Sequence, residues 1–290
     1  MDGPEPIATM RSTLGEDPVW SPNERSLYWV DIVGPTVHRL HEATGEIRTW
    51  RLPSEVGSMA LRRGGGAVVA LRSGFHLLDL ETGAVTLLID PEADRPTNRF
   101  NDGKCDRQGR FWAGTLEDAE QDPAGSLYRL DAAGGCERVL GDIVCSNGLG
   151  WSPDDQTMYH TDSWQFRIDA WDFDPATGAL QNRRPFVQLP PGRVAPDGLT
   201  VDAEGCLWVA TWDGWQVLRY APDGSVDRIV DLPVPRPTSC TFGGPDLDRL
   251  YITSARRGLG EEALAQAPLS GAVFVLEPGV RGLPEPEYAG

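Results

Sequence analysis

The chain has 290 residues, enough for one large domain or two ordinary ones, and its 43 acidic and 26 basic residues give a net charge of −17. This charge argues against a nucleic-acid partner, whose phosphates would be repelled, and no apolar run is long enough to span a membrane. With 33 Gly, 24 Pro and 10 Trp, the composition is typical of short strands joined by tight turns.

One pattern recurs along the chain: a turn with Asp, Gly or Pro, followed by a short apolar strand. Clear copies lie at 21–31, 106–115, 152–162, 202–211 and 244–254, with a degenerate copy at 63–70. The first apolar position of each strand serves as a ruler: Leu27, Ala67, Phe111, Met158, Leu207 and Leu250. The steps between them are 40 to 49 residues. Six units of about 45 residues match the period of a β-propeller.

Strand–turn–strand segments lie between the rulers, at 77–88, 127–135 and 218–226, and they predict hairpins. Each unit then holds four strands. We therefore expect an all-β fold, a six-bladed propeller with four-stranded blades. Six such blades need roughly 270 residues, so residues 1–290 should form a single domain. A segment around 7–12 should close the ring as the outer strand of the last blade, and 261–267 is the one stretch that resembles a helix.

The repeat also predicts a site. In a propeller, the innermost strand of each blade lines the central channel, and the loops that enter these strands meet at one mouth. We take the ruler strands as the innermost ones, so residues at one offset before the rulers should face one another across the axis. The residues ten or eleven positions before the rulers are Glu16, Gly57, Asn101, Asn147, Asp197 and Cys240. Four of these six carry carboxylate or carboxamide oxygens, the ligands that hard divalent cations prefer.

A second interpretation stays open at these positions, because Asn and Asp are common turn residues. Asn101, Asn147 and Asp197 each stand at or next to an Asn–Gly, Asp–Gly or Asn–Asp–Gly turn sequence. Glu16 is not a preferred turn residue, and it shares the offset. The metal hypothesis depends on that shared offset.

Four segments resemble the motifs of the SMP-30/gluconolactonase/regucalcin family of six-bladed propellers, in family order. They read LGEDPVW at 14–20, NRFNDGK at 98–104 followed by GRFWAGT at 109–115, SNGLGWSPD at 146–154, and PDGLTVD at 196–202. The resemblance extends from about Leu14 to about Leu276. The stretches at 253–259 and 268–274 are similar to the bacterial sugar-acid lactonases of that family.

The resemblance implies a site. A divalent cation would be held by Glu16, Asn147 and Asp197, while Arg99 and Asn101 would contact the substrate. The offset alone counts Asn101 as a fourth candidate ligand, so its role between metal and substrate stays open. Ca²⁺, Mg²⁺, Mn²⁺, Zn²⁺ and Fe²⁺ all suit such an oxygen-rich site.

These residues suggest metal-dependent hydrolysis of an aldonolactone, such as xylono-, arabinono- or gluconolactone, to its acid. Asp197 is the candidate base, and Arg99 could brace sugar hydroxyls. No motif for a covalent nucleophile occurs. A non-catalytic cation-binding propeller, or an esterase or organophosphate hydrolase, remains an alternative. We expect a monomer whose partner is a small sugar lactone, with no nucleic-acid or membrane partner.

The five cysteines are odd in number and form no C-x-x-C pair, which predicts free thiols: Cys105, Cys136, Cys145, Cys206 and Cys240. Residues 1–5 lack the pattern of a secretory signal, so we expect a cytoplasmic protein. Cys145 and Cys240 lie near the predicted mouth and are assigned to packing. His160 lies on a predicted inner strand, where it could line the channel or serve as a structural residue.

Overall fold

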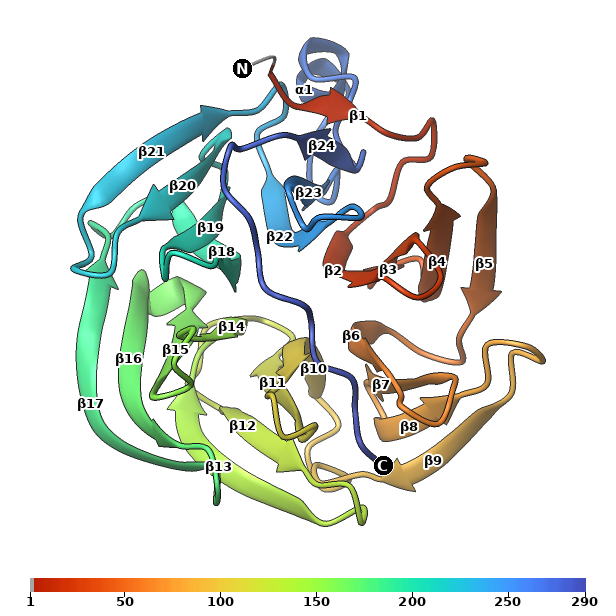
Figure 1. The fold of residues 1–290 in the computed structure, drawn as a ribbon, viewed down its shortest axis with the longest axis vertical. Coiled ribbons are helices and arrows are strands. Elements are labelled where there is room, and N and C mark those ends of the chain that lie inside the picture. Colours follow the sequence, from red (N-terminus) through yellow and green to blue (C-terminus); the bar gives the residue numbers. More distant parts are fainter. Residues whose placement is uncertain (1–2) are drawn as a thin grey trace.

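The computed structural model describes residues 3–290, whose strands form six four-stranded antiparallel sheets. The sheets stand around a central axis as the blades of a ring (Figure 1). In five blades, four consecutive strands follow one another from the axis outward. The sixth blade combines three strands from the end of the chain with one from its beginning. The predicted all-β, six-bladed propeller is confirmed.

The elements fall into four sets by their position in the blade. The innermost strands are β2 (Gly15–Ser21), β6 (Val56–Leu61), β10 (Asn98–Cys105), β14 (Ser146–Trp151), β18 (Ala195–Val201) and β22 (Pro237–Gly243). The second strands are β3 (Ser26–Asp31), β7 (Ala67–Leu71), β11 (Phe111–Glu117), β15 (Thr157–Asp162), β19 (Leu207–Trp212) and β23 (Arg249–Ser254). The third strands are β4 (Thr36–His41), β8 (Gly74–Leu78), β12 (Gly125–Leu130), β16 (Arg167–Asp174), β20 (Gln216–Tyr220) and β24 (Phe274–Leu276). The outer strands are β5 (Ile47–Arg51), β9 (Val85–Ile89), β13 (Cys136–Ile143), β17 (Ala179–Gln188), β21 (Val226–Asp231) and β1 (Glu5–Pro6).

The N-terminal segment closes the ring, as predicted. Strand β1 pairs antiparallel with β24, and both lie beside β23 and β22 in Figure 1. The paired strand is Glu5–Pro6, just before the predicted segment 7–12. That segment continues alongside the blade, where the amide of Ile7 donates to the carbonyl of Val273 at 3.0 Å. Closure by both ends of the chain leaves the ring without an open blade.

Helical structure is scarce in the described chain. A short 3-10 helix, η1 (Ser163–Gln165), follows β15, and one α-helix, α1 (Glu261–Gln266), follows β23 close to the predicted range. Among residues 3–290, no helix is long and apolar enough to cross a membrane.

The ruler positions lie on the second strand of each blade, and this corrects the expectation that they mark the innermost strand. The innermost strand is the one that precedes the ruler by a tight turn. The offset residues therefore lie on β-strands at the axis, and not in loops that enter them. The offset still selects equivalent positions, because a strand and its turn occupy a similar length in every blade.

Every innermost strand bulges at an equivalent place. The register against the second strand shifts at Glu16–Val19, Val56–Ser58, Phe100–Gly103, Asn147–Leu149, Pro196–Leu199 and Pro237–Cys240. A bulge inserts an extra residue opposite its partner strand and redirects the side chains beside it. Residues that read as turns in the sequence, such as Asn101-Asp102-Gly103, are these bulges.

The core lies between blades and is rich in tryptophan. Trp29, Trp112 and Trp208, on second strands, are at most 1% exposed, so they belong to this packing. The indole Nε1 atoms of Trp112 and Trp208 each donate at 2.9 Å to the Asp six residues earlier. The repeated turn Asp thus anchors the ring of its own blade, which ties the repeat in the sequence to the packing of the fold.

Candidate metal and substrate site

The starts of four innermost strands surround a cavity of about 240 Å³ at the axis. All five residues predicted for the site line this cavity: Glu16, Arg99, Asn101, Asn147 and Asp197. Each is 4–6% exposed. The structure therefore brings together side chains that are 181 positions apart at the extremes of the sequence.

Two of these side chains are positioned by the same device. Asp31, at the end of β3, accepts hydrogen bonds from the amides three and two residues before Glu16, at 2.7 and 3.1 Å. Asp162, at the end of β15, accepts from the amides three and two residues before Asn147, both at 3.1 Å. A buried carboxylate thus holds the entry to each strand and fixes where the bulge begins.

Asn147 and Asp197 lie in direct contact. The Nδ2 of Asn147 donates to Oδ1 of Asp197 and, at 3.1 Å, to Oγ of Ser163. The Oδ1 of Asn147 is buried and has no hydrogen-bond partner among residues 3–290. Leaving a buried acceptor unpaired costs about 1–3 kcal/mol, so such an atom needs an explanation. An oxygen of this kind beside carboxylates fits a divalent cation.

The two carboxylates among the predicted metal ligands, Glu16 and Asp197, are buried in acidic surroundings. Burial, and then the charges of Asp197 and Asp102, raise the pKa of Glu16 well above its usual range. Burial, and then the charge of Asp102, raise the pKa of Asp197 in the same way. No Lys, Arg or His among residues 3–290 forms an ion pair with either group. The donor set of two carboxylates and one orphaned carboxamide oxygen therefore fits the predicted cation.

Asn101 differs from Asn147 because both of its polar atoms have partners. Its Oδ1 accepts from Nη1 of Arg99 at 2.9 Å, and its Nδ2 donates to the carbonyl of Ser146 at 2.9 Å. Arg99 also donates to the carbonyl of Phe100 at 3.1 Å. Asn101 thus orients Arg99 at the cavity wall, an arrangement that suits a substrate contact better than a fourth metal ligand.

The remaining two offset positions contribute no side chain to the cavity. A Cβ added at Gly57 would lie 2.4 Å from the carbonyl oxygen of Asn101, so glycine permits the close approach of two innermost strands. The thiol of Cys240 donates to the carbonyl of Trp208 at 3.3 Å and packs in the core.

The other thiols and His160 have structural surroundings. All five cysteines are free, as predicted. Cys145 lines the cavity, where burial raises the pKa of its thiol well above the usual range. His160 does not line the cavity and lies on β15, a second strand. Its Nε2 contacts Oγ of Ser146 at 2.9 Å, and burial lowers its pKa to about 4.

Several residues of the cavity lie outside the positions that sequence analysis singled out. They are Glu120, Ser163, Trp164, Trp212, Arg236 and Arg257, together with the apolar Leu14, Leu116 and Ala195. Leu14 and Ala195 share an offset with Arg99, two positions before an offset residue, and Leu116, Ser163 and Trp212 each lie five positions after a ruler, so the repeat carried a signal for them. Glu120, Trp164, Arg236 and Arg257 lie outside the strands. Of these four, Arg257 alone stands in a stretch that carried the family resemblance, at 253–259.

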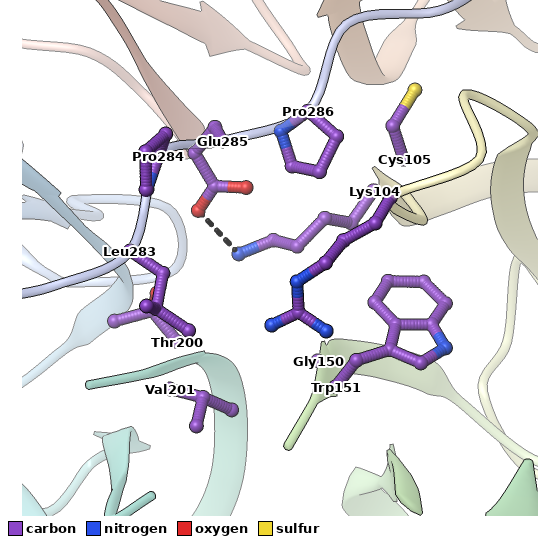
Figure 2. A pocket seen from close by; sticks show the side chains of 11 residues that line it. Lys104, Cys105, Gly150, Trp151, Thr200, Val201, Leu283, Pro284, Glu285 and Pro286 are labelled. Carbon is purple, nitrogen blue, oxygen red and sulfur yellow. Dashed lines mark hydrogen bonds and ion pairs between the residues drawn. The ribbon is translucent and has the colours of Figure 1, made fainter. Parts of the chain in front are cut away.

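A second polar cluster lies at the other end of the innermost strands (Figure 2). The Nζ of Lys104 donates to Oε1 of Glu285 at 3.1 Å and to the carbonyl of Leu199 at 3.2 Å. Burial raises the pKa of Asp17 and Asp102, and the nearby Lys104 charge opposes this rise in both. The C-terminal segment that carries Glu285 crosses the middle of the ring in Figure 1, so this end of the channel is covered.

A third acidic group lies at the turn after β18 and does not belong to the cavity. Ligand atoms of Asp202, Glu204 and Cys206 come within 4.8 Å of one another. The Oδ2 of Asp202 accepts from Nε1 of Trp208 and from Nε of Arg219, both at 2.9 Å, and Arg219 also pairs with Glu204 at 2.5 Å. Both carboxylates are paired with Arg219, whereas Glu16 and Asp197 have no basic partner among residues 3–290.

Comparisons with known proteins point to the same family as the sequence motifs. Residues 14–256 match the family described as SMP-30/Gluconolactonase/LRE-like region. The chain belongs to this family. A 6-deoxy-6-sulfogluconolactonase of Pseudomonas putida is 44% identical over 98% of both chains. Regucalcin of Xenopus laevis is 40% identical, over 96% of this chain and 95% of its own.

Among solved structures of the SMP-30/gluconolactonase family, the chain resembles a calcium-binding protein, regucalcin, from Agrobacterium tumefaciens. The TM-score is 0.96 at 32% identity, covering 100% of this chain and 98% of the other. Lactone hydrolysis and calcium binding thus both occur in the names of close relatives. The family resemblance derived from the sequence motifs is confirmed.

Proposed function

We propose that this protein hydrolyses a sugar-acid lactone, an aldonolactone such as xylono-, arabinono- or gluconolactone, with the help of one divalent cation. Glu16, Asn147 and Asp197 would hold the cation. The observation that carries the proposal is the unpaired, buried Oδ1 of Asn147 beside two carboxylates without a basic partner. The lactonase relative supports the choice of reaction.

A divalent cation bound there would polarise the lactone carbonyl and lower the pKa of water. The protein's own groups supply the remaining chemistry. Asp197 would take a proton from the attacking water and pass it to the departing ring oxygen. Asn147 holds that carboxylate in place through its Nδ2. Arg99 and Asn101 would orient the sugar hydroxyls.

A non-catalytic, cation-binding role is the second candidate, favoured by the regucalcin relatives. The two candidates share the ligand set and differ in what the cavity wall does. Arg99, 6% exposed and braced by Asn101, has no function in a site that only binds a cation. An esterase or organophosphate hydrolase would use the same cation against an apolar substrate.

The test is hydrolysis of a lactone panel, followed by acid release, with and without chelator and with each of Ca²⁺, Mg²⁺, Mn²⁺, Zn²⁺ and Fe²⁺ added back. The panel holds gluconolactone, xylonolactone, arabinonolactone and galactonolactone, with phenyl acetate and paraoxon for the third candidate. We expect Asp197→Asn to lower kcat by about 10²–10⁴-fold. Glu204→Gln is the matched control, because Glu204 belongs to the acidic group at the turn after β18, outside the cavity. This variant should retain full activity.

Two results would contradict the proposal. If wild type and Asp197→Asn both hydrolyse every lactone only at the background rate, the lactonase proposal is wrong. Binding of a cation in calorimetry would then favour the non-catalytic candidate. Full activity after chelation would remove the cation from the reaction.

A further inference from the structure

Three arginines reach the wall of the cavity in a protein whose net charge is −17. They are Arg99 on β10, Arg236 just before β22, and Arg257 just after β23. Their surroundings differ, and the difference shows which charge is available to a ligand.

Arg236 is neutralised and held rigid. Its Nε donates to Oδ1 of Asp213 at 2.6 Å, and its guanidinium lies 4.6 Å from the ring centre of Trp212. Its Nη1 donates to the carbonyl of Arg257. The backbone amide of Arg257 also donates to the carbonyl of Thr13, at 2.8 Å. Arg236 therefore acts as a support that fixes the loop carrying Arg257.

Arg99 and Arg257 share a single carboxylate. Oε1 of Glu120 lies 3.8 Å from Nη2 of Arg99 and 3.9 Å from Nη1 of Arg257, both beyond hydrogen-bond length. The other oxygen of Glu120 accepts from Nε1 of Trp164 at 2.8 Å. The next carboxylate, Asp118, is bound by both Nη atoms of Arg72, at 3.0 and 2.8 Å.

This wall thus holds two guanidinium groups and one carboxylate. Within residues 3–290, the side chain of Arg257 donates no hydrogen bond, and it is 43% exposed at the cavity. Burial lowers the pKa of Arg99, and the nearby charge of Arg257 lowers it further, so the two cations are close enough to repel each other. An anion between them would relieve that repulsion and fill the unused donors.

We propose that this wall selects lactones that carry a second, negatively charged group away from the ring carbonyl: a sulfonate, a phosphate or a carboxylate. The inference rests on the proposed function, because it names the substrate class of the same cavity. Arg257 would be the specificity-determining residue, and Arg99 would contact both the anion and the sugar. The anion is not altered in the reaction, so these contacts should act mainly on KM.

The test compares lactones that differ only at C6: gluconolactone, its 6-phosphate, its 6-deoxy-6-sulfo form, and the lactone of glucaric acid. We expect the kcat/KM of wild type to be about tenfold or more higher for at least one charged lactone than for gluconolactone. The comparison among the three charged lactones identifies which anion the protein prefers. Arg257→Gln should raise KM for that lactone at least about tenfold more than KM for gluconolactone. Arg257→Lys should recover part of the loss, because it restores the charge without the planar fork.

Arg256→Gln is the matched control, since Arg256 is exposed, adjacent and outside the cavity wall; it should leave both lactones unchanged. Equal use of neutral and charged lactones by wild type, or an equal loss on both in Arg257→Gln, would overturn the inference while leaving the lactonase intact. If no lactone is hydrolysed, the proposed function fails by itself. The anion site can then still be tested by calorimetry, which measures the binding of 6-phosphogluconate and gluconate to wild type and to Arg257→Gln. If wild type binds the two acids with equal affinity, the anion site is ruled out.

Discussion

The two ends of the central channel both bury carboxylates, and they balance them differently. At one end, Glu16 and Asp197 have no basic partner, and Oδ1 of Asn147 is unpaired. Further along the channel, Asp17 and Asp102 lie near Lys104, the single lysine of the chain, whose Nζ pairs with Glu285 at the other end. Lys104 is the internal cation of one cluster, whereas the other cluster is the one at which we propose that a divalent cation binds.

Neighbouring residues of one strand serve these two clusters. Glu16 lines the cavity, while the next residue, Asp17, accepts a hydrogen bond from the amide of Met59 at 2.6 Å. Asp17 has φ of 46°, within the bulge of β2, and this backbone directs the two carboxylates apart. The bulge is therefore what divides one acidic sequence between a binding site and a structural cluster.

The largest expected effect comes from removing the internal cation. Lys104→Met leaves Asp17, Asp102 and Glu285 buried without it, and we expect the free energy of unfolding to fall by about 3–5 kcal/mol. Denaturant unfolding of the chelator-treated protein measures this. Arg107→Met, at a residue near Lys104 that is one-third exposed, should cost no more than about 1 kcal/mol. Equal stability of Lys104→Met and wild type would show that the cluster does not depend on the lysine.

At the cavity, removing one charged group should have the opposite effect on the free energy of unfolding. Glu16→Gln removes a buried charge that repels Asp197, so in chelator its unfolding free energy should equal or exceed that of wild type. A cation at 100 times its Kd should stabilise wild type by about 2.7 kcal/mol, and Glu16→Gln should lose this gain. Thermal unfolding with and without cation measures both quantities.

Glu285→Gln is the control for this second prediction, because it alters the cluster around Lys104. It should lower stability and keep the response to cation. If Glu16→Gln destabilises the chelator-treated protein as Lys104→Met does, the two ends are not balanced differently.

The smallest expected effect concerns the segment that covers the closed end. Tyr288 is 1% exposed, and its hydroxyl donates to the carbonyl of Asp131 at 2.7 Å, far along the chain. Tyr288→Phe removes only this bond, and we expect unfolding to become easier by about 1 kcal/mol. Tyr220→Phe, which loses a buried ring's hydroxyl without such a bond, should stay within about 0.5 kcal/mol of wild type in the same denaturant titration. Equal losses in both variants would show that the bond to Asp131 does not hold the segment.

The sequence by itself determined the number of blades and the positions that meet at the axis. Repeated units fold alike, so an equal offset in Glu16, Asn101, Asn147 and Asp197 becomes an equal height in the channel. The repeat also located the N-terminal strand that closes the ring to within a few residues, because a closed ring of blades leaves no unpaired strand edge between its first and last blade. It placed the rulers one strand too far inward, because period alone does not say which strand of a hairpin lies at the axis.

Only the tertiary structure decided how charge is distributed around that axis. Arg257, Glu120 and Glu285 come from segments outside the repeat, so no offset predicts where their side chains reach. The bulge that separates Glu16 from Asp17 depends on pairing with β3, and the partner of Lys104 lies 181 residues along the chain. Ion pairing is a property of atoms a few ångströms apart, and the fold alone brings those atoms together.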